Sequence, residues 1–318
     1  MSQVVNIVVT CTKQKTLEPP DGLQLRNVTG KTVSDRARRW VAVLQKSREP
    51  QVSALDLYAG DHWAVARDLQ TLGTASREIR VWVISAGYGL VSIDQAMCPY
   101  SATFSNPHPD SVILADRDEP LPDQKAAWWN AVTTASWKRR TVTSLSDLAS
   151  SMPESPMIIA ASKNYLDAVY DDLLAATHRL QRTGMVTVIS AGTNRLGELS
   201  ENLAPADARL QHYVGGIRRS LNIRLTRHVL QQTKRGNISA GRVRGLLGAM
   251  LEEAPDLQKF DRTPMSDREI KKYIANVMKN STKVSHTPLL REFRANGNAC
   301  EQKRFRKLFQ KVQETTRG

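Results

Sequence analysis

The chain has 318 residues, is 41% hydrophobic and carries a formal net charge of +14. No apolar run approaches the roughly 18 residues that cross a bilayer, so we expect no membrane span. Its three cysteines are widely separated and lack paired metal-ligand spacing, which favours neither a disulfide framework nor a metal site and fits a reducing cytoplasm.

The positive charge lies in the last third of the chain. Residues 207–318 hold 24 Lys+Arg against 10 Asp+Glu, whereas residues 1–206 hold 21 of each. Such asymmetry is typical of a neutral catalytic or ligand-binding body joined to a part that binds nucleic acid. A solvated basic surface that only improves solubility is the alternative.

The first predicted strand is the apolar run NIVVT at residues 6–10. Lys13 and Lys15 follow it directly. Two lysines past the end of a buried strand predict a site for a DNA phosphate, and a solvated surface loop is equally compatible with them.

Residues 52–58, VSALDLY, are predicted to form a second strand that delivers Asp61 and His62 to the same edge of the sheet. Asp61 is well placed to cap the following helix, which is a purely structural role. A carboxylate beside an imidazole at a strand end can also activate a water molecule, and both interpretations stay open.

Residues 81–84 form a continuous apolar run that ends in small residues at Ser85 and Gly87. This pattern predicts a strand of a parallel sheet, buried on both faces. Ligands collect outside the carboxyl ends of such strands, so the segment from Ser85 to Tyr100 is the first candidate site. Gly87 permits a close approach of the backbone, and Tyr88 and Tyr100 offer flat faces. An ordinary turn with two core tyrosines is the alternative.

Two further strands are predicted at residues 157–161 and 186–190. Lys163 follows the first, and the second repeats the string VISAG before Asn194. Alternating strands and helices up to about residue 195 predict one three-layer α/β/α domain with a mostly parallel sheet, over residues 1–205. The third glycine of the dinucleotide fingerprint is missing, with Ser92 in its place, and so is the phosphate-loop motif. We therefore expect no NAD, ATP or other cofactor.

The basic third is predicted to be helical throughout. Residues 206–262 form a basic helical connector that includes Arg218 and Arg219. Residues 263–318 read as three short helices, the last carrying Arg304 and Lys307, in a helix-turn-helix or winged-helix-like DNA-binding domain.

The strings CTKQK, LYAGDHW and ISAGYGLVSIDQAMCPY resemble a prokaryotic and phage family of uncharacterised domains with a uracil-DNA-glycosylase-like fold. The resemblance covers roughly residues 4–105. The family is related to domains of archaeosine-forming and hypermodified-base enzymes. The two contiguous signatures of authentic uracil glycosylases, Gly-Gln-Asp-Pro-Tyr and His-Pro-Ser-Pro, are absent, so Asp61 first and Asp94 second are the candidates for the catalytic carboxylate.

With the basic tail, this resemblance implies a monofunctional DNA glycosylase that acts in anti-phage defence. It would hydrolyse the N-glycosidic bond of a modified base in double-stranded phage DNA, glucosylated hydroxymethylcytosine, and leave abasic sites. No lysine has a pKa-lowering neighbourhood in the sequence, which favours hydrolysis over lyase chemistry. A transferase that exchanges or builds modified bases in DNA or RNA, and a non-catalytic DNA-binding protein, remain as alternatives.

The expected site depends on the Asp61 loop and the two SAG turns meeting at one sheet margin. The residues expected to bind the flipped nucleotide are Ser85, Gly87, Tyr88, Tyr100, Asn194 and His62. The residues expected to bind DNA phosphates are Lys13, Lys15, Lys163, Arg218, Arg219, Arg304 and Lys307.

Overall fold

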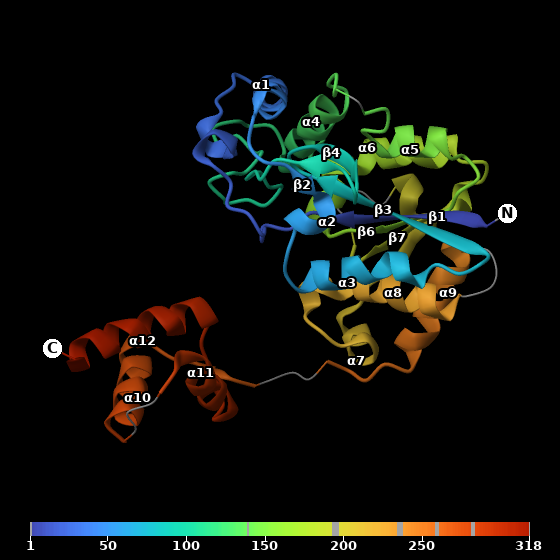
Figure 1. The fold of residues 1–318 in the computed structure, drawn as a ribbon. Coiled ribbons are helices and arrows are strands. Elements are labelled where there is room, and N and C mark those ends of the chain that lie inside the picture. The colour runs from blue at the N-terminus through green and yellow to red at the C-terminus, as the bar shows by residue number, and fades with distance from the viewer. Residues whose placement is uncertain are drawn as a thin grey trace. The chain divides into compact units, whose positions relative to one another are not determined.

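A computed structural model of the chain describes residues 2–138, 140–192, 197–233, 238–257, 261–280 and 284–317 (Figure 1). The chain divides into two units, Met1–Pro255 and Asp256–Gly318. The boundary thus falls 50 residues later than the predicted end of the α/β domain at residue 205.

The first unit is built on a six-stranded sheet in the order β4-β3-β1-β6-β7-β8. Only β4 is antiparallel to its neighbour, which confirms the predicted mostly parallel sheet. The strands are β1 (Gln3–Thr10), β3 (Arg77–Ser85), β4 (Gly89–Ser92), β6 (Met157–Ala160), β7 (Val186–Ser190) and β8 (Leu203–Pro205).

Helices cover both faces of this sheet (Figure 1). One face carries α1 (Val33–Lys46), α4 (Leu121–Thr133), α5 (Leu145–Ser151) and α6 (Lys163–Arg179). The other carries α3 (Asp61–Leu69), α8 (Leu221–Gln232) and α9 (Ala240–Glu252). Because both faces are covered, central strand β1 needs apolar side chains on each, and Val5, Ile7, Val8 and Val9 are all 0% exposed.

Short elements complete the unit. They are β2 (Val52–Ser53), which pairs with β5 (Ala96–Met97), the single-turn helices α2 (Ala54–Leu57) and α7 (Gln211–Val214), and the 3-10 turns η1 (Asp21–Leu23), η2 (Leu25–Asn27), η3 (Gln70–Leu72), η4 (Thr183–Met185), η5 (Gly197–Asn202), η6 (Ala208–Leu210) and η7 (Arg218–Ser220).

The strand predicted at residues 52–58 is wrong. Only Val52–Ser53 at its start and Tyr58 at its end are extended, and a helical turn, Ala54–Leu57, lies between them. The Ser53 hydroxyl accepts a hydrogen bond from the backbone of Asp56, so a local cap overrides the β-propensity of the segment.

The basic connector predicted at residues 206–262 is also wrong for most of its length. Helix α8 packs on β6 and β7, and α9 packs on β7 and β8. Arg77 of β3, only 5% exposed, donates 2.9 Å hydrogen bonds to the carbonyls of Leu230 and Thr233. Residues up to Pro255 therefore complete one helical layer of the first unit.

The second unit contains α10 (Asp267–Asn280), α11 (His286–Ala295) and α12 (Gln302–Arg317), with a two-stranded sheet of β9 (Thr263–Pro264) and β10 (Asn298–Ala299). Its own core includes Ile270, Phe293 and Phe305, each at most 1% exposed. Three helices agree with the predicted number in this part of the chain. In the described residues of both units, none of the helices has the length and apolarity to traverse a bilayer.

Candidate functional site

The candidate site is the sheet edge at which β1, β3, β6 and β7 end. These strands run parallel, so Thr10, Ser85, Ala160 and Ser190 lie at the same edge. The two SAG turns follow β3 and β7, and β1 and β6 lie between them. Three strand spacings separate the turns by about 14 Å. The centre of the edge therefore belongs to the segments that follow β1 and β6.

A buried hydroxyl network lies under this edge. The Tyr100 hydroxyl is 2.8 Å from both the Ser85 and the Tyr58 hydroxyl. Ser85 Oγ also accepts hydrogen bonds from the backbone of Gly87 and Tyr88, which closes the turn after β3. Burial raises the pKa of the Tyr58 and Tyr100 phenols well above its ordinary value, so both stay neutral. The three hydroxyl groups of Ser85, Tyr58 and Tyr100 therefore form an uncharged floor, the buried layer directly under the sheet edge.

The stacking role predicted for Tyr88 and Tyr100 needs correction. Their residues are 7% and 0% exposed, so neither ring has a face free for a base. Tyr88 stacks on Trp137, and its hydroxyl accepts from the backbone of Cys98. Gly87 has a packing role, because a Cβ there would lie 2.5 Å from the Tyr100 ring. The alternative of two core tyrosines describes these residues.

Lys15 lies over this floor. Its Nζ is 4.4 Å from the centre of the Tyr100 ring and 5.5 Å from that of Tyr58. Burial is the largest influence on this amine and lowers the pKa of Lys15. The predicted phosphate-binding lysine is therefore a partly buried amine on an aromatic platform.

Cys11 and Tyr165 connect β1 with the start of α6. The Cys11 thiol is 3.1 Å from the Tyr165 hydroxyl, which donates to the Cys11 carbonyl at 3.0 Å. The Tyr165 ring packs edge-on against Phe104 from the loop after β5. Segments more than 150 residues apart thus meet beside Lys15.

Asp61 is the first residue of α3 and is held by the chain before and within α8. One carboxylate oxygen is 2.7 Å from the Arg224 guanidinium, and the other accepts from the Ser220 hydroxyl. The Ser220 hydrogen bond, followed by Arg224, lowers the pKa of Asp61. The carboxylate is therefore ionised at neutral pH and ties α3 to α8, while its role in activating water stays a prediction.

His62, next to Asp61, is turned into the protein. Its Nε2 atom is buried with no hydrogen-bond partner among the described residues. Burial lowers the pKa of His62 to about 4, so the ring is neutral near pH 7. The imidazole and the Asp61 carboxylate thus have different surroundings, and contact of His62 with a nucleotide stays a prediction.

Asp94, the second predicted carboxylate, lies far from this edge. It is exposed in the turn after β4, and β4 runs antiparallel to β3. The neighbouring Ile93 backbone bonds to Val81, in the middle of β3. An antiparallel return carries Asp94 away from the carboxyl end of β3, so we remove it from the site.

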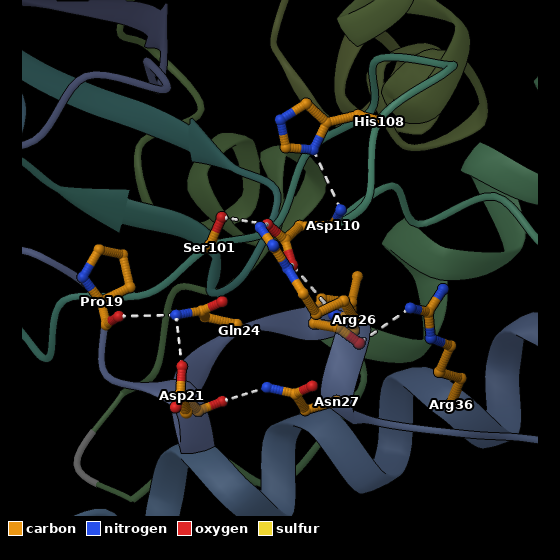
Figure 2. A network of polar contacts seen from close by, with 10 residues as sticks. Pro19, Asp21, Gln24, Arg26, Asn27, Arg36, Ser101, His108 and Asp110 are labelled. Atoms are coloured by element: carbon orange, nitrogen blue, oxygen red, sulfur yellow. Dashed lines mark hydrogen bonds and ion pairs between the residues drawn. The ribbon is translucent and has the colours of Figure 1, made fainter.

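Asp110 is a carboxylate that the sequence analysis missed. Its side chain is 0% exposed and accepts hydrogen bonds from Arg26 Nε at 2.8 Å and from the Ser101 hydroxyl at 2.7 Å (Figure 2). Burial by itself would raise the pKa of Asp110, but the hydrogen bonds from Arg26 and Ser101 outweigh it and hold the pKa at about 2. The backbone N–H of Asp110 donates to His108 Nδ1.

This Asp110 cluster joins two irregular loops, residues 19–28 and 101–111 (Figure 2). Arg36 of α1 adds to it by donating to the carbonyls of Leu25 and Ser111. Each segment contains two prolines, a composition typical of loops. Composition does not specify which cation and which carboxylate meet.

Four exposed cations surround the edge. Lys13 follows β1 and Lys163 begins α6. Arg218 and Arg219 precede Asn222, whose side-chain amide donates to the Ala161 carbonyl just past β6 at 2.8 Å. These cations come from three distant segments and are exposed, while their contact with DNA phosphates stays a prediction.

Three predicted residues remain. Asn194 lies outside the described residues. Arg304 and Lys307 are on α12 of the second unit, where Arg304 pairs with Asp267 at 2.6 Å and Lys307 is exposed. A pairing within its own unit makes Arg304 a weaker candidate for DNA contact than Lys307.

A cavity of about 870 Å³ lies between α4, α5 and α6 and is lined by Trp129, Trp137 and Arg179 among others. Arg179 ends α6, whereas Lys163 begins it at the sheet edge. The lining follows α6 from Ala168 to Arg179 and includes Arg140, which donates to the Tyr88 carbonyl in the turn after β3. The cavity therefore lies along the helices that cover the sheet, next to that turn.

Comparisons of the chain with protein-family models, with curated proteins and with solved structures find no match.

Proposed function

We propose that the chain is a DNA glycosylase that excises a modified base, with glucosylated hydroxymethylcytosine of phage DNA as its substrate. The observation that carries the proposal is the sheet edge itself. There the exposed cations Lys13, Lys163, Arg218 and Arg219 surround the partly buried amine of Lys15. The uracil-DNA-glycosylase-like fold suggested by the sequence motifs belongs to the same proposal.

The reaction needs an extruded nucleotide, because a duplex hides the glycosidic bond. Flipping costs a few kcal/mol, which phosphate contacts and contacts to the flipped base must offset. The cations at the edge would hold the phosphates on either side of the flipped nucleotide. His108, in the loop of residues 101–111, is a polar group that can read the hydroxyls of a glucosylated base.

Cleavage of the C–N bond passes through an oxocarbenium-like sugar, which an adjacent carboxylate stabilises. Asp61 remains the candidate, since its lowered pKa keeps it ionised at neutral pH. Asp110 is ionised as well, but its side chain is 0% exposed, whereas the side chain of Asp61 is 35% exposed. In this proposal Asp110 supports the loops and Asp61 acts on the sugar.

The second unit would bind the duplex without regard to sequence. Its three helices and the exposed cations of α12, Lys303, Arg306, Lys307 and Lys311, support a helix-turn-helix-like DNA-binding role. Lys307→Gln should lower DNA affinity uniformly and reduce its salt dependence.

The test is release of free base. Purified protein is incubated with glucosylated and with unmodified phage DNA, and products are followed by mass spectrometry and by alkali-labile breaks. We expect base and abasic sites from glucosylated DNA only, and at least about 100-fold less from Asp61→Asn. Asp94→Asn is the matched control and should keep full activity, because Asp94 lies away from the edge.

Other results of this assay would distinguish the alternative functions. No base from any modified DNA contradicts the glycosylase proposal. Turnover that requires an added free base would favour a transferase. An active Asp61→Asn protein with wild-type fluorescence would exclude Asp61 and keep the rest of the proposal.

A further inference from the structure

Lys15 is held in place by its own backbone, which forms an antiparallel bridge with Tyr58. The Ala59 N–H donates to the Gln14 carbonyl at 3.0 Å, and the Thr16 N–H donates to the Leu57 carbonyl at 2.9 Å. Bonds on both sides of Lys15 fix where its side chain starts. The amine is therefore positioned before any ligand arrives.

In the described part of the chain, no counter-charge is paired with this amine. Among the described residues, no carboxylate lies within ion-pair distance of Lys15, and its one printed hydrogen bond is a long one of 3.4 Å to the Thr12 carbonyl. The two phenols beneath it are neutral, because burial raises the pKa of both. Asp110, the nearby acid, is saturated by Arg26 and Ser101.

A lysine amine attacks carbon only in its neutral form. Burial lowers the pKa of Lys15, with smaller opposing effects of Cys11 and Asp110. Desolvation without a direct anionic partner is the setting in which lysines become nucleophiles. Lys46, at the end of α1, is exposed and offers a comparison outside the site.

We propose that Lys15 is a covalent nucleophile that captures the aldehyde of an abasic deoxyribose as an imine. The inference rests on the proposed function, whose product is that sugar, and it replaces the expectation of a purely hydrolytic enzyme. The ring-opened sugar presents a C1′ aldehyde, and the Tyr58 and Tyr100 rings under Lys15 hold the amine just past the end of β1.

Imine formation needs only the Lys15 amine and the sugar aldehyde, and it releases water. The lone pair of the neutral Lys15 nitrogen forms a bond to C1′, and the carbonyl oxygen becomes a hydroxyl. Two protons from the nitrogen end on that oxygen, which leaves as water and gives a C1′=N double bond. Addition of water in the reverse direction releases the sugar and restores the amine.

The test uses the full chain and a synthetic duplex with a preformed abasic site, so that base release is not needed. Sodium borohydride reduces an imine to a stable amine, which gives a protein–DNA adduct that is visible on a denaturing gel. We expect adducts with wild type and with Lys46→Arg in equal amounts, and at least about tenfold less with Lys15→Arg. Peptide mass mapping should place the modification on Lys15.

Three results would overturn the inference: no adduct with wild type, equal trapping with Lys15→Arg, or a modification mapped to another residue. Mapping is done on the wild type, so it decides the question even if Lys15→Arg fails to fold. The two proposals fail separately. Base release without trapping removes the covalent role of Lys15, and trapping without base release from any modified DNA removes the glycosylase.

Discussion

Replacement of Asp110 by asparagine tests whether this buried carboxylate holds the loops around the site. Asp110 is 0% exposed and accepts hydrogen bonds from the Arg26 backbone and guanidinium and from Ser101 (Figure 2). An amide keeps one acceptor oxygen but turns an NH₂ group toward the guanidinium. Arg26 would keep its charge and lose its partner.

The magnitude follows from the pKa. Asp110 titrates at about 2 instead of near 3.8, and each unit corresponds to about 1.4 kcal/mol. The ionised form therefore contributes about 2 kcal/mol. Asp110→Asn should lower the free energy of unfolding by about 2–3 kcal/mol at pH 7, which is less than for a fully buried pair because the Arg26 side chain is 46% exposed.

The stabilisation by Asp110 should decrease as the pH falls. A carboxyl with a depressed pKa stabilises the fold above its unfolded pKa and loses that contribution as pH falls through its folded pKa. The difference between wild type and Asp110→Asn should thus be constant above pH 5, about half as large at pH 3, and smaller still near pH 2.

The assay is urea unfolding followed by tryptophan fluorescence at several pH values. All six tryptophans lie in the first unit, so their emission reports on that unit. A loss below about 0.5 kcal/mol at pH 7, or a difference that stays the same from pH 7 to pH 3, would refute the assigned role of Asp110.

Three further substitutions test the packing around the site. The pKa of His62 is about 4 in the folded chain and near 6.5 in the unfolded chain, so the unfolded chain takes up a proton first as the pH falls. Between pH 7 and pH 5 the free energy of unfolding of wild type should therefore fall by about 2 kcal/mol relative to that of His62→Phe in the same urea assay. The same pH dependence in both proteins would contradict this. Gly87→Ala should lower the free energy of unfolding by about 2–4 kcal/mol, because its methyl group would meet the Tyr100 ring. Gly245→Ala, whose methyl group would have nothing within 4 Å, should leave the free energy of unfolding unchanged or raise it by up to about 1 kcal/mol. Similar melting temperatures for the two variants would count against the contact of Gly87 with Tyr100. Arg77→Met should lower the free energy of unfolding by about 2–3 kcal/mol, because the carbonyls of Leu230 and Thr233 would lose their hydrogen-bond donor. Arg80 forms an exposed ion pair with Glu78, so Arg80→Met should change it by less than about 0.5 kcal/mol. Equal effects of the two substitutions would argue against a stabilising contact between Arg77 and the end of α8.

Local pattern was enough for much of the fold. Apolar runs at β1, β3, β6 and β7 indicated strands buried on both faces, and such strands require a parallel sheet with helices on either side. The parallel order then placed their carboxyl ends at one edge. Lys13, Lys15 and Lys163 were located in this way without any contact being known.

The local sequence pattern did not predict the role of a side chain whose neighbours come from distant parts of the chain. Tyr100 follows a strand end like a binding residue, yet it is buried by Trp40 and Tyr58. Lys15 reads as a solvated cation until Tyr58 and Tyr100 are seen beneath it.

The sequence by itself determined four strands (β1, β3, β6 and β7), the edge at which they end and the unequal distribution of charge, because apolar runs and charge are properties of neighbours along the chain. Only the tertiary structure decided which carboxylates are engaged, since Asp61 meets Arg224 across 163 residues and Asp110 meets Arg26 across 84. Burial and pairing of a charge depend on residues that no local pattern specifies, and those two quantities govern whether the group anchors the fold or reacts.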